Sequence, residues 1–89
     1  MTYKIHIAAE AEETLISLPR KIQRQISEKI DMLTQNPRPP GVEKLKGLAD
    51  LYRIRSGDYR IVFRIQHKKL LVLVVRIGHR RDIYQNLPW

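Results

Sequence analysis

The side chains best suited to chemistry in this sequence are arginines that recur at every second position of two neighbouring segments. In residues 51–55 and 59–66 an apolar or aromatic residue recurs at every second position and most positions between are arginine, a period of two that is typical of strands with one buried face. The short, turn-prone connection between them predicts an antiparallel hairpin. One face of this hairpin carries Tyr52, Ile54, Tyr59, Ile61, Phe63 and Ile65, and the other carries Arg53, Arg55, Arg60, Val62 and Arg64.

Hairpin pairing brings Arg55 close to Arg60, because neighbouring strands lie about 4.8 Å apart. Like charges at that separation repel and cost stability, a cost that is easier to explain if an anion binds between them. A guanidinium grips phosphate oxygens with two hydrogen bonds and also stacks on bases. A single arginine on an exposed face is usually just solvated, so the prediction of a phosphate-binding face depends on the convergence of several.

Two further candidates follow the last predicted strand. His79 is the side chain here whose ordinary pKa lies nearest neutrality, and it comes directly after that strand. Tyr84, placed beside a cationic groove, would stack a base. A lone histidine is more often structural or exposed, and a lone tyrosine is more often a core or surface aromatic, so both depend on the arginines for a functional interpretation.

A strong positive charge predicts a polyanionic partner. The chain carries 17 Lys and Arg against 9 Asp and Glu, a formal net charge of +8, which favours nucleic acid or an acidic protein. No segment approaches the roughly 20 apolar residues of a spanning helix, and no signal-peptide core follows the N-terminus. We therefore expect no membrane partner and a cytoplasmic location, which the absence of cysteine also fits.

Motifs for metal and cofactor chemistry are missing from the sequence. It contains no H-E-x-x-H, no glycine-rich phosphate loop, no His/Cys cluster and no convincing pair of carboxylates. We therefore expect neither a metal nor a cofactor, and we expect any nuclease activity to be metal-independent.

The remaining patterns predict the elements that position the arginines. Alternation predicts a strand over residues 3–7, and helical spacing predicts helices over 8–18 and 22–33, ended by the proline-rich segment 36–41. A third strand of the second half, 70–77, follows the hairpin. The order β-α-α-β-β-β predicts a single α+β domain, residues 1–89, with a largely antiparallel sheet and a helical hairpin packed on one face.

The third strand is apolar on both faces. We expect Leu71, Leu73, Val75 and Ile77 to face the core, and Leu70, Val72 and Val74 to lie on the other side with Arg76. A strand of this kind is normally covered on both faces, here by the tail with Leu87 and Trp89 or by a partner, although a central position in the sheet explains most of the pattern.

Four blocks together resemble one known family. They are Asn-Pro-Arg-Pro at 36–39, Lys-Leu-Lys-Gly-Leu at 44–48, the run from Tyr52 to Phe63 with its Gly-Asp-Tyr-Arg, and the run from Val75 to Tyr84 with its Gly-His-Arg-Arg-Asp-Ile-Tyr. Their types and spacing resemble the RelE/ParE toxin superfamily, its RelE branch in particular, over nearly the whole chain.

The resemblance implies a RelE-like fold and the toxin of a type II toxin–antitoxin system. Such a toxin is a ribosome-dependent mRNA endoribonuclease, or mRNA interferase, which cuts at the A site and inhibits translation. The 2′-hydroxyl of the RNA attacks the adjacent phosphate and gives a 2′,3′-cyclic phosphate and a 5′-hydroxyl. The implied partners are a cognate antitoxin, RelB-like or other, the ribosome and its mRNA, and operator DNA only through the antitoxin complex.

The resemblance also implies the site. Carried over by position, the implied catalytic residues are Arg55, Arg60, Arg80, Tyr84 and His79. The implied RNA- and phosphate-binding residues are Arg53, Arg64, Arg76, Arg81, Lys44 and Lys46. Some relatives have lysine where this chain has Arg53 and Arg55, and arginine cannot release a proton at working pH. Proton transfer would then fall to His79, to Tyr84 or to water.

Three other functions stay open at this level. A ParE-like poison of DNA gyrase belongs to the same superfamily and needs no nuclease site. A non-catalytic RNA-binding module would bind RNA with strong salt dependence but release no cyclic-phosphate ends. A degenerate toxin could survive as a DNA-binding co-repressor with its antitoxin.

Overall fold

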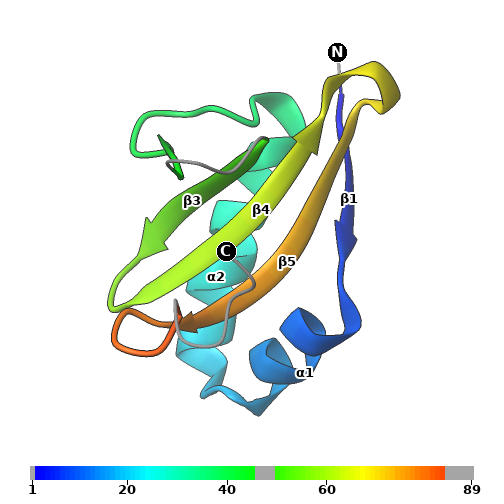
Figure 1. The fold of residues 1–89 in the computed structure, drawn as a ribbon. Helices are drawn as coiled ribbons and strands as arrows, with labels where there is room; N and C mark the ends of the chain where they lie inside the picture. Colours follow the sequence, from blue (N-terminus) through cyan, green and yellow to red (C-terminus); the bar gives the residue numbers. More distant parts are fainter. Residues whose placement is uncertain (1, 46–49, 84–89) are drawn as a thin grey trace.

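The computed structural model describes residues 2–45 and 50–83, and Figure 1 shows their arrangement. The elements in chain order are β1 (Lys4–Ile7), α1 (Ala9–Ser17), α2 (Arg20–Gln35), β2 (Glu43–Lys44), β3 (Leu51–Ser56), β4 (Tyr59–Gln66), the short 3₁₀ helix η1 (His67–Lys69) and β5 (Leu71–His79). The predicted α+β class and order are confirmed. The two-residue strand β2 is an addition, and it is too short to show a period.

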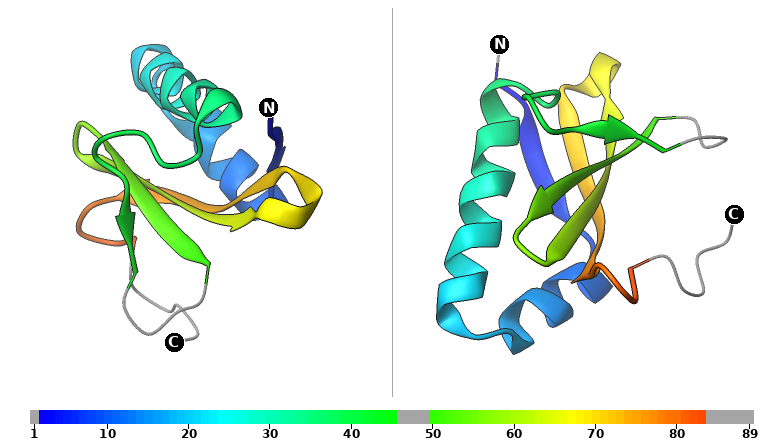
Figure 2. Two further views of the ribbon diagram at one scale, coloured as in Figure 1. Left: turned by 90° about the horizontal axis from the view of Figure 1, so that it is seen from above. Right: turned by 90° about the vertical axis from the view of Figure 1, so that its left-hand side faces the viewer.

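The strands form one sheet in the order β1-β5-β4-β3-β2. β1 runs parallel to β5, and the other three pairs are antiparallel, which makes the sheet largely antiparallel as expected. Both helices lie on one face of it (Figures 1 and 2). We call the opposite face the distal face.

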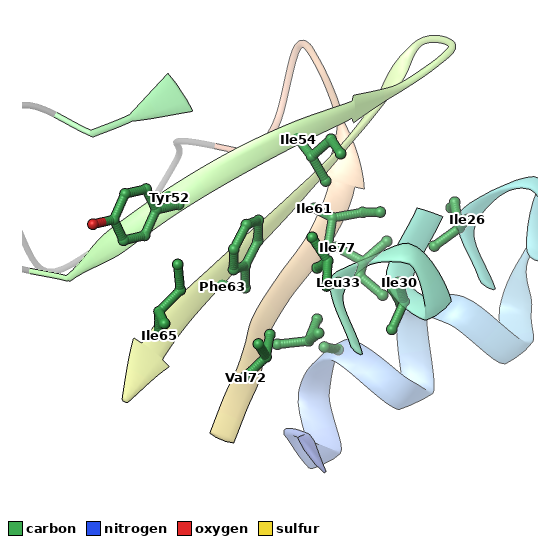
Figure 3. Close-up of a cluster of buried hydrophobic side chains, with 12 residues drawn as sticks. Ile26, Ile30, Leu33, Tyr52, Ile54, Ile61, Phe63, Ile65, Val72 and Ile77 are labelled. Carbon is green, nitrogen blue, oxygen red and sulfur yellow. The ribbon is translucent and has the colours of Figure 1, made fainter. Parts of the chain in front are cut away.

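The main core fills the space between the helices and the sheet (Figure 3). Helical spacing in α2 places Ile26, Ile30 and Leu33 on one stripe, and all three are buried. Phe63 is fully buried in the middle of β4, where its ring stacks at 6.0 Å from that of Tyr52. The predicted inward face of the β3–β4 hairpin is therefore confirmed, with Tyr59 half-buried at its end.

The predicted faces of β5 are wrong for most of the strand. Val72 and Val74 are fully buried in the main core, whereas Leu71 and Leu73 are only half-buried. The register explains the error, because Phe63 pairs with Val74 while its neighbour Val62 pairs with Arg76. One extra residue, Val75, is inserted there, and a bulge of this kind reverses the alternation beyond it. Ile77 consequently faces the core as predicted.

The distal face has a small apolar cluster of its own. Leu51, Val62 and Ile83 are buried in it, and Val75 packs against them. Ile83 comes from the turn after β5, so this turn covers part of the second face of β5; Leu87 and Trp89 lie outside the described residues. Gly78 permits the contact, because a Cβ there would lie 3.1 Å from Cδ1 of Ile83. No helix in the described part of the chain is long and apolar enough to span a membrane.

Candidate functional site: a cationic edge of the sheet

The turn of the β3–β4 hairpin holds Arg60 in place. Ser56 pairs with Tyr59 across a two-residue turn, and Gly57 takes a φ of 59° at its first position, as a type II′ hairpin turn requires. Nη1 of Arg60 donates hydrogen bonds of 3.0 Å to the carbonyl oxygens of both Gly57 and Tyr59. The guanidinium is thus fixed before any ligand arrives, which is the arrangement that charge stabilisation needs.

The predicted proximity of two arginines is confirmed by the register of this hairpin. Arg55 and Arg60 are direct partners, and Arg55 is exposed. Arg53 lies two residues further along the same face of β3, opposite Val62. Arg64 is exposed but lies about 13 Å from Arg60 along β4, at about 3.3 Å per residue. The hairpin therefore gathers three of the four arginines.

Arg80 joins this group from the end of β5. Its backbone N–H donates to the carbonyl of Asp58 at 2.8 Å, and its Nε lies 3.9 Å from Oδ1 of the same residue. Both side chains are mostly exposed, so this ion pair is weak and a phosphate can replace it. Arg60 and Arg80 both contact the Gly57–Asp58 turn and so lie at one end of the sheet.

His79 does not point to the arginine face. It is the last residue of β5 and pairs with Tyr59, whose ring it meets edge-on at 5.6 Å on the helix side of the sheet. Its Nδ1 accepts the backbone N–H of Arg81 at 3.2 Å, which assigns the proton of the neutral ring to Nε2. That hydrogen bond shapes the turn that carries Arg80, so the geometry gives His79 a positioning role.

Glu43 is a second acidic side chain of the site, besides Asp58. Its Oε2 accepts a hydrogen bond of 2.6 Å from Nη2 of Arg53. That hydrogen bond and the charge of Arg53, followed by the more distant charges of Arg55 and Arg60, hold the pKa of Glu43 below its usual range. It lines a groove of about 390 Å³ with Lys29 of α2, Pro40, Gly41, Arg53, Ile54, Arg55 and Arg60. Strand alternation predicts neither Lys29 nor Glu43, because they lie on other elements; no signal in the sequence marks Lys29.

The guanidinium of Arg76, which the sequence predicts to bind phosphate, contacts protein groups away from Arg55, Arg60 and Arg80. Its Nη2 lies 3.4 Å from Oε1 of Glu10, and its Nη1 donates to the carbonyl of Ile83 at 3.3 Å. These contacts tie β5 to α1 and to the turn after β5. Of the other predicted phosphate ligands, Lys44 and Arg81 are exposed, and Lys46 lies outside the described residues, as does the catalytic candidate Tyr84.

Comparison with known proteins gives the family. A model of the ParE toxin of type II toxin–antitoxin systems matches residues 5–84. The chain belongs to the RelE/ParE superfamily of type II toxins. The predicted resemblance is therefore confirmed, and the match covers the helices, the hairpin and the end of β5 together.

Its individual relatives carry RelE-type names. The chain is 30% identical over 86 residues to toxin RelG of Mycobacterium tuberculosis, covering 96% of this chain and 99% of that one. It is 29% identical over 82 residues to the mRNA interferase toxin RelE of Escherichia coli K12, covering 90% and 85%. In three dimensions it matches a chain of the archaeal RelE–RelB complex from Pyrococcus horikoshii with a TM-score of 0.81 and 33% identity, covering 92% and 99%.

Proposed function

We propose that this protein is a ribosome-dependent mRNA endoribonuclease of a type II toxin–antitoxin system, which cuts messenger RNA at the A site and so inhibits translation. The observation that carries the proposal is the convergence of Arg55, Arg60 and Arg80 at one end of the sheet. A related toxin carries the name mRNA interferase, and this activity requires a site that binds an RNA phosphate.

The proposed reaction needs no metal. The 2′-oxygen of one ribose attacks the adjacent phosphorus, the bond to the 5′-oxygen of the next nucleotide breaks, and the products are a 2′,3′-cyclic phosphate and a 5′-hydroxyl. Charge builds up on the phosphate oxygens in the transition state, where Arg55, Arg60 and Arg80 stabilise it. Arg60 contributes most, because its hydrogen bonds to the turn hold it in position beforehand.

Proton transfer is assigned to groups other than the arginines. The 2′-hydroxyl loses a proton and the leaving 5′-oxygen gains one, and arginine does neither at working pH. His79 is held through Nδ1 by the backbone of Arg81 and lies beside Tyr59 rather than Arg60, so it acts by positioning the turn. Tyr84 and water are the remaining candidates, with Tyr84 also proposed to stack a base.

The site offers few groups that can transfer a proton, and this explains why the proposed cleavage needs the ribosome. A site that works mainly by electrostatic stabilisation depends on a substrate already bent into the geometry for in-line attack. We propose that the ribosome supplies that geometry for the A-site codon. Exposed Lys44, Arg64 and Arg81 are then available for contacts to neighbouring phosphates.

The proposed partner that controls the protein is a cognate antitoxin. The similar archaeal RelE structure is a complex with RelB. An acidic segment would meet a chain with a formal net charge of +8, and opposite charge speeds such an encounter. We propose that the toxin acts in the cytoplasm, where ribosomes are, and that it reaches operator DNA only through the antitoxin complex.

A ParE-like action on DNA gyrase is the second candidate, because the matching family model carries the ParE description. The two functions leave different damage. Induced expression followed by parallel analysis of RNA and DNA should give messenger fragments with 5′-hydroxyl ends and intact chromosomes. DNA breaks with intact messengers would support gyrase, and binding of RNA without any cuts would support a non-catalytic module.

A further inference from the structure

In the described part of the chain, β2 covers the edge of β3 at Tyr52 and Arg53 and leaves it open beside Ile54 and Arg55. The chain before β2 bends back toward α2 instead of following β3 further. Figure 2 shows this segment crossing between the helix layer and β2. The opening is the groove of about 390 Å³, which lies at the lower end of the size range of ligand pockets.

One wall of this groove is a rigid turn. The carbonyl of Pro39 accepts the N–H of Val42 at 3.1 Å, with Pro40 and Gly41 between them. Gly41 has a φ of 94°, and proline followed by glycine at that value is the signature of a type II turn. Val42 packs against the main core and anchors the turn. The groove therefore has a preformed back wall.

The charges that line the groove favour an anion. Lys29, Arg53, Arg55 and Arg60 contribute four positive charges, and Glu43 contributes one negative charge. Lys29 is half-buried and comes from the opposite layer of the fold, across from the hairpin. Arg53 already binds one oxyanion there, the carboxylate of Glu43, and Arg55 and Arg60 add to the field on that carboxylate. The lining thus binds a carboxylate and offers more positive charge than one carboxylate neutralises.

We propose that this groove is a second phosphate subsite, which takes a backbone phosphate of the RNA next to the scissile one, and that Lys29 is its ligand from the helix layer. The inference builds on the proposed function. Arg60 links the two positions, since it lines the groove and also pairs with Gly78, two residues before Arg80. An RNA strand that crosses the sheet from β5 to β3 would place the scissile phosphate between Arg80 and Arg60, and the next phosphate between Arg60 and Lys29.

A paired substitution on α2 tests the subsite. Lys29→Gln removes the proposed ligand, and Lys21→Gln removes an exposed lysine of the same helix that does not line the groove. The probe is a 2′-O-methylated RNA hexanucleotide, which the purified full-length chain can bind but cannot cut. Anisotropy titrations at several salt concentrations measure its affinity and the salt slope, and circular dichroism checks the fold.

The expected result is specific to Lys29. Loss of one phosphate contact lowers the slope of log affinity against log salt by about 0.7, which corresponds to about fivefold weaker binding near 0.1 M salt. Lys29→Arg should restore both values, and Lys21→Gln should leave both unchanged. Equal effects of the two glutamine variants, or weaker binding of Lys29→Gln with an unchanged slope, would overturn the subsite. So would a Lys29→Gln variant that binds the RNA normally but loses an acidic antitoxin peptide.

The proposed function and the subsite can fail separately. If the native chain cuts messengers in a translating extract and Lys29→Gln binds and cuts equally well, the subsite is wrong and the nuclease stands. If the native chain cuts nothing while Lys29→Gln still lowers affinity and slope, the nuclease is wrong and the phosphate subsite stands.

Discussion

Arg60 is the residue whose replacement best separates catalysis from stability. Arg60→Ala removes two hydrogen bonds of 3.0 Å to carbonyl oxygens of the hairpin turn, each worth about 0.5–1.5 kcal/mol. Water can reach the exposed turn and replace part of them, and the repulsion between Arg55 and Arg60 disappears. We therefore expect a loss of about 1–2 kcal/mol in the free energy of unfolding. A domain that starts near 5 kcal/mol stays more than about 99% folded.

The expected loss of activity is much larger. Removing one preorganised donor to the charge of a transition state costs about 10²–10³ in rate, or about 2.7–4 kcal/mol. The assay follows the cutting of one messenger at one codon over time in a translating extract. Arg60→Lys should recover part of the rate, because it keeps the charge but loses the planar fork.

Arg24→Ala is the matched control. It removes an exposed arginine from α2, so it changes the net charge equally and should cut at the rate of the native chain. An Arg60→Ala rate within about threefold of the control, in a folded protein, would refute the catalytic role of Arg60. A rate loss no greater than the loss of folded protein would make Arg60 structural only.

Three further predictions concern other parts of the account. Arg80→Ala should lower the cutting rate at least tenfold and change stability by less than about 0.5 kcal/mol, because its ion pair with Asp58 is exposed; unchanged cutting would remove Arg80 from the site. Gly78→Ala places a Cβ 3.1 Å from Cδ1 of Ile83, which must shift by a few tenths of an ångström, and should cost about 1 kcal/mol in urea unfolding. Ile83→Val removes that methyl group, so Gly78→Ala should cost less in the Ile83→Val background than in the native chain, and an equal cost in both would argue against the clash. The lowered pKa of Glu43 means that its stabilising effect is complete above its ordinary value of 4.5 and is lost as the pH falls through the lower folded value. The gap in urea midpoint between the native chain and Glu43→Gln should therefore shrink below pH 4.5 and in high salt, and a constant gap would contradict the ion pair.

Local patterns were enough to predict the β3–β4 hairpin. A two-residue turn and strict alternation fix both its register and its faces, and so the Arg55–Arg60 pair follows from the sequence. The same reasoning failed on β5, where a single inserted residue at the bulge shifts Val72 and Val74 to the core. Residues 70–75 are all apolar, so alternation has no polar residue there by which to locate such a bulge.

Contacts between distant segments account for the rest of the site. Lys29 joins the arginines only because α2 packs beside the open edge of β3, and β2 and Glu43 are held there by pairing with Arg53. Arg76 has the residue type of a phosphate ligand, but Glu10 and the carbonyl of Ile83 bind its guanidinium. His79 follows the predicted strand, yet the strand continues through it and turns its ring toward Tyr59. Periodicity along one element contains none of this information.

The most direct test of the central claim uses one messenger in two forms, with the purified protein added to a translating extract and the RNA ends mapped by primer extension. One form has its start codon and the other lacks it, so they differ in translation but hardly in sequence. We predict cuts inside codons, in phase with the reading frame, on the translated form only. Equal cutting of both forms without codon phase, or no cutting of either by a folded protein, would contradict the account.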